Sequence, residues 1–166
     1  MAVLNDEQEM LRDMAREWTK NEHPVDAWRK VRDAGQPFDA DAWGEMGEMG
    51  WAGIIIPEEH GGTDFGWLSL GLVIEELGKS LAASPLVPSA LAASAIVLGG
   101  SDEQKAEYLP RLATGELIGT LAFDEGPRHT GLKVSTSVHD GRLTGTKAFV
   151  HEASRAGLFV VLASDG

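Results

Sequence analysis

The residues that could carry chemistry in this chain are few, and their spacing excludes several kinds of site. The sequence has no cysteine, which excludes disulfide frameworks, thiolate zinc sites, iron–sulfur clusters and cysteine nucleophiles. The histidines are His23, His60, His129, His139 and His151. No two of them lie three or four residues apart on a predicted helix, so we expect no metal site. No serine lies in a Gly-x-Ser-x-Gly nucleophile elbow, and no glycine-rich phosphate loop is present.

The remaining acid–base candidate is the adjacent pair Glu58–Glu59. Neighbouring carboxylates in a polar, glycine-bearing segment are more typical of a solvated turn than of a catalytic pair. The residues taken one by one therefore do not define a reaction.

Charge and composition narrow the possible partners. The chain has 166 residues, with 14 Lys and Arg against 26 Asp and Glu, a net charge of −12. This charge repels phosphate backbones and anionic lipid, so we expect no nucleic-acid partner. The most apolar stretch, Leu81 to Leu98, is interrupted by serines and prolines, and the amino terminus lacks a basic segment followed by an apolar one. We therefore predict no membrane insertion and a cytoplasmic protein.

Helical spacing dominates the first two thirds of the sequence. Residues that can cap a helix are Asn5 with Gln8, Asp39, and Ser101 with Gln104. Helices are predicted from about residue 6, over 25–32, after Asp39, over 67–77 with Gly78 as a left-handed cap, from Ser89 to residue 99, and from Ser101 until Pro110 and Gly115 end it. Most of the Trp and Met side chains fall at core-facing positions of these helices.

The period changes to two after Gly115. Residues 117–123, 132–138, 142–150 and 158–163 are predicted as strands, with Asp140-Gly141 as a hairpin turn. We predict an α+β fold with an all-α domain over 1–115 and a partial antiparallel, barrel-like β domain over 116–166. Such a sheet has open edges, so we expect a continuation or a partner chain to complete it.

Several segments in succession resemble the amino-terminal half of the flavin-dependent acyl-CoA dehydrogenases. They read WGEMGEMGWAGIIIPEEHGGTDFG, then IEELGKS, then GSDEQKAEYLPRLATGEL. Each motif is weak alone, but their order is specific, and the resemblance covers nearly all of residues 4–163. It implies a helical domain followed by a β-barrel-like middle domain, with FAD between that middle domain and a later helical bundle.

The same resemblance assigns residues to the flavin. The family's threonine-glutamate-proline stretch corresponds to Asp124-Glu125-Gly126, so a carboxylate replaces a flavin-bonding hydroxyl, and the loop that follows is shortened. In the later segment, Phe149 stands where an indole packs on the flavin and His151 where a hydroxyl bonds it. The cofactor-binding residues implied in this way are Phe123, Asp124, Glu125, Thr130, Phe149 and His151. Without the resemblance, Phe149 would be an inward-facing strand residue, His151 a strand-end polar residue, and Asp124-Glu125 a solvated turn.

The resemblance implies α,β-dehydrogenation of an acyl-CoA thioester with hydride transfer to FAD. The ligand is expected between residues 62–77 and 121–130. The family's catalytic glutamate lies in the later domain, so no catalytic residue is assigned here, and this chain alone is expected to be silent. Expected partners are other dehydrogenase-like chains in a homo- or hetero-oligomer and an electron-accepting flavoprotein.

Two other functions stay open. The chain could be a non-catalytic dehydrogenase-like subunit that completes a partner, because the flavin-facing positions depart from the family pattern. It could also be an acyl-CoA carrier, although no basic cluster is available for the CoA phosphates.

Overall fold

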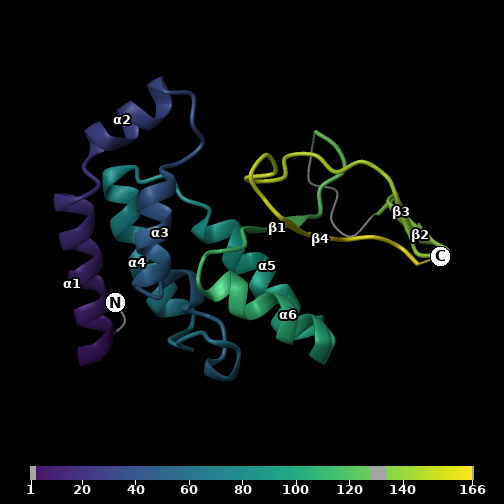
Figure 1. The fold of residues 1–166 in the computed structure, drawn as a ribbon, viewed down its shortest axis with the longest axis horizontal. Coiled ribbons are helices and arrows are strands. Elements are labelled where there is room, and N and C mark those ends of the chain that lie inside the picture. The colour runs from purple at the N-terminus through teal and green to yellow at the C-terminus, as the bar shows by residue number, and fades with distance from the viewer. Residues whose placement is uncertain (1–2, 128–133, 166) are drawn as a thin grey trace.

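The structure is a computed structural model that describes residues 3–127 and 134–165. Its helices are α1 (Asp6–Asn21), α2 (Val25–Asp33), α3 (Ala40–Glu48), α4 (Gly66–Ser80), α5 (Leu86–Gly99) and α6 (Asp102–Ala113), with short 3₁₀ turns η1 (Trp51–Gly53) and η2 (Glu58–His60). The strands are β1 (Gly119–Ala122), β2 (Ser137–His139), β3 (Arg142–Thr144) and β4 (Leu158–Val161). Figure 1 shows the helices gathered on one side and the strand-bearing part extending from α5 and α6. The predicted α+β fold class is confirmed.

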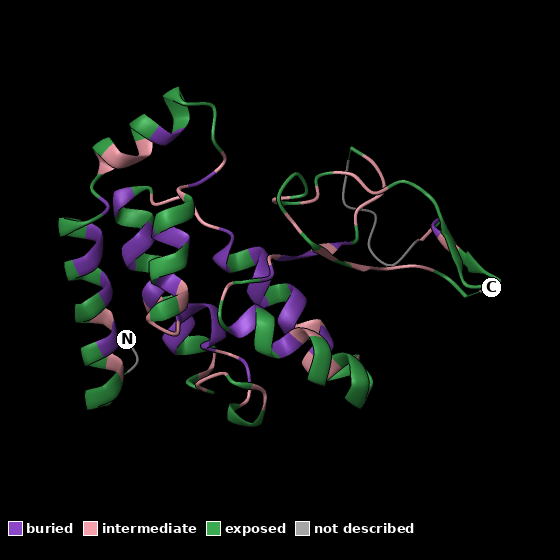
Figure 2. Ribbon diagram, viewed as in Figure 1, coloured by how far each residue is buried: buried purple, intermediate pink, exposed green. Residues whose placement is uncertain are grey.

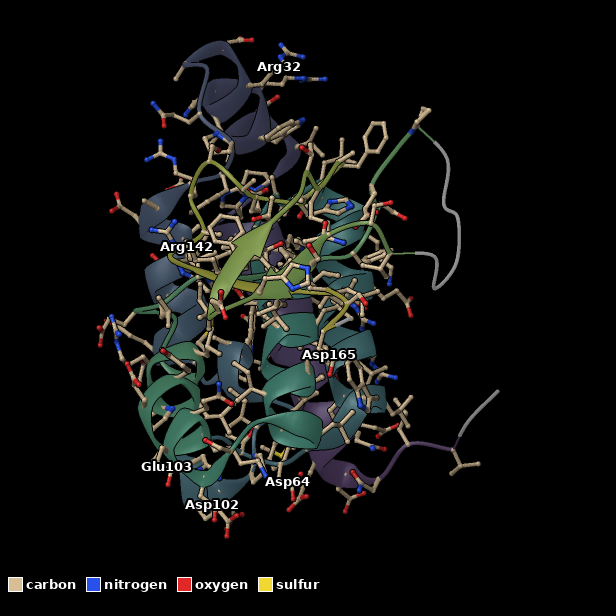
Figure 3. All side chains as sticks on the ribbon, turned by 90° about the vertical axis from the view of Figure 1, so that its right-hand side faces the viewer. Arg32, Asp64, Asp102, Glu103, Arg142 and Asp165 are labelled. Atoms are coloured by element: carbon tan, nitrogen blue, oxygen red, sulfur yellow. The ribbon has the colours of Figure 1, made fainter. Side chains whose placement is uncertain are left out.

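The predicted helix starts follow from local capping chemistry. The Asn5 side chain accepts a hydrogen bond from the Gln8 amide at 2.8 Å, and Ser101 and Gln104 form the same reciprocal box at α6. Asp39 accepts from the Asp41 amide at 3.0 Å and so caps α3. Each cap satisfies amides that the helix itself leaves free, which is why these starts can be predicted from sequence. Figure 3 shows Asp102 and Glu103 projecting from the first turn of α6, where negative charge favours the helix dipole.

Two predicted helix boundaries are wrong because tertiary packing overrides local signals. Helix α4 does not stop at Gly78 but continues to Ser80, and Leu81 takes the left-handed cap with φ 58°. The buried side chains of Leu77 and Ser80 keep this last turn helical. Helix α5 begins before Ser89, because Leu86 is buried and the Ser89 amide already donates to the Pro85 carbonyl.

Helix α6 was expected to end at Pro110 and Gly115; it passes through Pro110 but ends at Ala113, with Gly115 following at φ 75°. Pro110 lies inside the helix, between Leu109 and Leu112, which are 0% and 1% exposed. Burial of both leucines holds the turn despite the missing amide of Pro110.

The core has two adjoining parts. One joins α1, α3, α4 and the start of α5, and the other joins α5, α6 and the approach to β1. Figure 2 shows their buried inner faces in purple. Trp18, Trp43, Trp51 and Met46 are buried as predicted, but Met10, Met14 and Trp67 are exposed. The Trp and Met residues are therefore only partly explained by core packing.

The strands pair differently from the expectation in one respect. β2 and β3 form the predicted antiparallel hairpin, with Asp140 and Gly141 both at positive φ, as a tight primed turn requires. β1, however, pairs with β4 in parallel, Gly119 opposite Leu158 and Ala122 opposite Val161. The long segment between β1 and β4 crosses back before β4 begins, so the two strands run in the same direction.

The strand predicted over 142–150 is shorter than expected. β3 ends at Thr144, and Gly145 lies against Thr136 so closely that a Cβ there would stand 2.4 Å from its hydroxyl oxygen. The chain therefore leaves its pairing with β2 at Gly145, where it passes close to Thr136. The predicted strand over 132–138 lies partly outside the described residues; its described part contributes β2.

β1 is fixed directly on α5. Gly119 lies where a Cβ would stand 2.8 Å from that of Ala92, and the Gly119 amide donates to the Ser89 hydroxyl at 3.3 Å. This close approach places β1 beside the first turns of α5. The helix-to-strand change falls between Ala113 and Gly119.

Candidate functional site

A groove of about 320 Å³ lies between the start of α5 and the end of β1. Its lining residues are Ser84, Val87, Pro88, Leu91, Leu121, Phe123, His151 and Glu152. The ligand position was predicted between residues 62–77 and 121–130. That position stays a prediction, and none of residues 62–77 lines this groove, whose helical side is formed by α5 and by Ser84 two residues before it.

The groove is lined mainly by apolar side chains, with a few polar ones among them. Val87 and Leu91 on α5 are 44% and 40% exposed, although both are aliphatic. Leu121 and Phe123 line the groove from β1 and the residue that follows it, while Ser84, His151 and Glu152 supply the polar groups. An apolar groove with a few polar groups is typical of a small-molecule site.

The His151 backbone is held by one buried hydroxyl. Thr120 is fully buried in β1, and its Oγ1 donates a hydrogen bond of 2.7 Å to the His151 carbonyl. The backbone of residue 151 is thereby tied to the strand that carries Leu121 and Phe123. His151 lies in a turn and not at the end of a strand.

Of the predicted flavin-facing residues, the structure brings Phe123 and His151 together in the groove. Phe149 is not among the residues that line it. Its ring is 73% exposed and its backbone has φ 52°, so the alternative of an inward-facing strand residue is wrong. The Asp124 carbonyl accepts from the Ala148 amide at 2.7 Å. Thr130 lies outside the described residues.

Glu125 is engaged inside the protein. One carboxylate oxygen accepts from Lys147 Nζ and the Thr136 amide, both at 2.8 Å, and the other accepts from the Ser135 amide at 2.6 Å. The Lys147 ammonium, helped by these amides, holds the pKa of the Glu125 carboxyl far below its ordinary range. The side chain is 13% exposed, so the solvated-turn alternative does not hold for Glu125.

Sequence reasoning missed the α5 wall and the partner of Glu125. Positions 87, 88 and 91 follow the three-and-four spacing of one face of α5, which is a visible signal. It was hidden because α5 is apolar around most of its circumference. Lys147 gave no signal, because its pairing joins segments 22 residues apart.

The described residues contain neither a candidate metal site nor a helix that could cross a membrane. No group of three or more His, Asp or Glu side chains that could hold a metal ion occurs among residues 3–127 and 134–165. Within the same ranges, none of the helices is long and apolar enough to cross a membrane.

Comparison with known proteins identifies the family. Residues 5–116 match the family model for the acyl-CoA dehydrogenase N-terminal domain. The chain belongs to the acyl-CoA dehydrogenase family. It is similar to acryloyl-CoA reductase (NADH) of Anaerotignum propionicum, with 36% identity over 170 residues, covering 96% of this chain and 42% of that protein.

Solved structures agree with this assignment. The ChsE4-ChsE5 complex from Mycobacterium tuberculosis matches with TM-score 0.86 and 26% identity, over 99% of this chain and 46% of that one. An acyl-CoA dehydrogenase from Bacillus anthracis complexed with FAD matches with TM-score 0.70 and 28% identity, over 98% and 30%. The chain thus spans less than half the length of these proteins.

Proposed function

We propose that this chain supplies the acyl-chain wall and a flavin-facing edge for FAD-dependent α,β-dehydrogenation of an acyl-CoA thioester. The groove between α5 and β1 is the observation that carries this proposal. Bound FAD would supply the acceptor for the hydride that leaves the acyl β carbon, and the α proton would pass to the carboxylate base that the family resemblance assigns to a later domain. The electrons would then pass to an electron-accepting flavoprotein.

The residues of the groove fit both ligands. Val87, Pro88 and Leu91 offer an aliphatic surface to an acyl chain, which gains free energy by leaving water. Phe123 is 39% exposed at the same groove and offers a ring face against which a flat aromatic cofactor can pack. His151 lines the groove and offers a ring nitrogen for a hydrogen bond to the cofactor or thioester.

A matched pair of substitutions on α5 tests the groove. Leu91 lines it, whereas Leu98 lies on the same helix, is 86% exposed and is not a lining residue. We expect Leu91→Arg to weaken octanoyl-CoA binding about tenfold or more, since a charge replaces an apolar wall. Leu98→Arg should leave it unchanged. Titration calorimetry measures both, and equal affinities in the two variants would refute the groove assignment.

A second candidate function is that of a non-catalytic subunit in a heteromer. It is favoured by the similarity to one chain of a two-chain complex, ChsE4-ChsE5, and by the engagement of the Glu125 carboxylate with Lys147 and backbone amides, which leaves it out of the groove lining. Co-purification with a longer acyl-CoA dehydrogenase chain, with flavin measured by absorbance, separates the two functions. Flavin bound by this chain without a partner favours the first, and flavin found only in the mixed complex favours the second.

A further inference from the structure

We infer that Lys147 and Glu125 form a positioning pair that holds the β-side wall of the groove in its binding geometry. This inference rests on the proposed function, because it concerns the same groove. Neither residue lines the groove, so the pair would act through Phe123 and His151.

The pair ties three separate segments together at one buried point. The two side chains are 8% and 13% exposed, and their ion pair is 2.8 Å long. Lys147 Nζ also donates to the Phe123 carbonyl at 3.3 Å, while Glu125 accepts from the amides of Ser135 and Thr136. The segment that follows β1, the segment that precedes β2 and the segment that precedes Phe149 are thus joined.

The tie lies directly beside the groove wall. The Phe123 carbonyl accepts a hydrogen bond from the Lys147 ammonium, so the position of the Phe123 backbone depends on the pair. Further along, the Ala148 amide donates to the Asp124 carbonyl, and Thr120 Oγ1 holds the His151 carbonyl. Residues 147–151 are therefore anchored to 120–125 at both ends, with Phe149 between the anchors at φ 52°.

The geometry also predicts that the effect of breaking the pair is local. The hydrogen bonds described above for these two side chains all join residues within 123–147 of the described chain. Removing Lys147 would leave the Glu125 carboxylate poorly compensated, and the segments it holds would shift to find water.

The test compares Lys147→Met, which removes the charge, with Lys147→Arg, which keeps it. Binding of octanoyl-CoA is measured by calorimetry and binding of FAD by flavin fluorescence. All five tryptophans lie at or before residue 67, so tryptophan fluorescence follows unfolding of the helical part. We expect Lys147→Met to weaken binding of both probes about tenfold, because a small displacement of a binding wall is costly. Lys147→Arg should stay close to wild type, and the unfolding midpoint should not move in either variant.

Three results would overturn the inference. They are unchanged binding by Lys147→Met, equal losses in Lys147→Met and Lys147→Arg, and a lowered tryptophan unfolding midpoint in Lys147→Met, which would make the pair part of the general fold. If wild type binds neither probe, the proposed function fails, and hydrogen exchange then judges the pair separately. Lys147→Met, but not Lys147→Arg, must speed exchange at residues 121–125 and 147–151; unchanged exchange would overturn the inference.

Discussion

At the scale of single residues, Phe149 is unusual because a bulky side chain occupies the left-handed region, with φ 52°. For a residue with a Cβ this conformation costs about 1–2 kcal/mol, whereas glycine adopts it freely. Such strain is often found where a side chain is presented to a ligand. The exposed ring, fixed between two hydrogen-bonded anchors, is consistent with that role in the proposed function.

A pair of substitutions at Phe149 separates the effect of the ring on stability from the effect of the backbone conformation. Both Phe149→Gly and Phe149→Ala remove the ring, but only glycine relieves the conformation. We expect the glycine variant to be more stable than the alanine variant by about 1 kcal/mol. Native-state hydrogen exchange in β1 and β4 measures this difference. A glycine variant no more stable than the alanine variant would show that the backbone there is not strained.

Glu76 gives a second residue-scale prediction, on pH dependence. Its side chain is 2% exposed, and burial raises its pKa, but hydrogen bonds from Lys79 and Arg16 outweigh this effect. The pKa of the folded state therefore lies below the ordinary 4.5. A lowered carboxyl pKa stabilises the fold above the unfolded-state value, and that contribution is lost as pH falls through the folded-state value.

Glu76→Gln should remove this pH dependence. We expect the variant to lose about 2 kcal/mol at neutral pH, the value of hydrogen bonds to a charged group. Between about pH 5 and about pH 3 its stability should then fall less steeply than that of wild type. Urea unfolding followed by tryptophan fluorescence across this range is the measurement, and parallel pH profiles for the two proteins would contradict the account.

At the scale of elements, the glycine-rich helix α3 shows why composition alone misleads. Gly44 and Gly47 weaken a helix by intrinsic propensity, yet α3 forms. A Cβ on Gly47 would stand 2.2 Å from the Thr114 carbonyl oxygen, so this glycine permits α3 to approach the end of α6. Nothing lies within 4 Å of the same position on Gly44.

The two glycines therefore respond oppositely to alanine. Gly47→Ala should cost about 2 kcal/mol, because the clash is with backbone that cannot rotate away. Gly44→Ala should stabilise by about 1 kcal/mol through helix propensity. Denaturant unfolding of both variants tests the pair, and a stabilised Gly47→Ala would show that the approach to Thr114 is not close.

The same element scale explains which parts of the fold were predictable. The starts of α1, α3 and α6 depend on capping side chains that bond amides within three residues of the cap. Asn5, Asp39 and Ser101 therefore indicate these starts in the sequence. The end of α4 and the course of α6 through Pro110 depend on what packs against them. The parallel pairing of β1 with β4 depends on a crossover that no local pattern records.

The candidate site divides in a similar way. Phe123 and His151 were identified through family resemblance, and the structure brings them to one groove. The α5 wall was missed because an alanine-rich helix, apolar nearly all round, does not reveal which face stays open. Glu125 was placed at the flavin, but its engagement with Lys147 is a long-range contact that only the fold reveals.

At the scale of the whole molecule, stability is unevenly distributed. Helix α4 buries Leu70, Val73 and Leu77, whereas β3 is exposed along its length, as the green colouring in Figure 2 shows. Amides in well-packed elements exchange only through large openings, and those in exposed hairpins exchange readily. We expect slow hydrogen exchange in α4 and fast exchange in β2 and β3. Equal protection in a demonstrated monomer would contradict this distribution.

The central claim is that the groove between α5 and β1 receives the acyl chain. The molecule has a competing apolar hollow of about 280 Å³ on the far side of the helical part, lined by Met10, Leu11, Met14, Phe65 and Glu7. An octanoyl-CoA analogue with a photoreactive diazirine at the end of its acyl chain distinguishes the two directly, with the labelled residues located by mass spectrometry. The account predicts labels on residues 84–91 and 121–123 that free octanoyl-CoA suppresses. Labels on Met10, Met14 or Phe65, with none on α5 or β1, would contradict it.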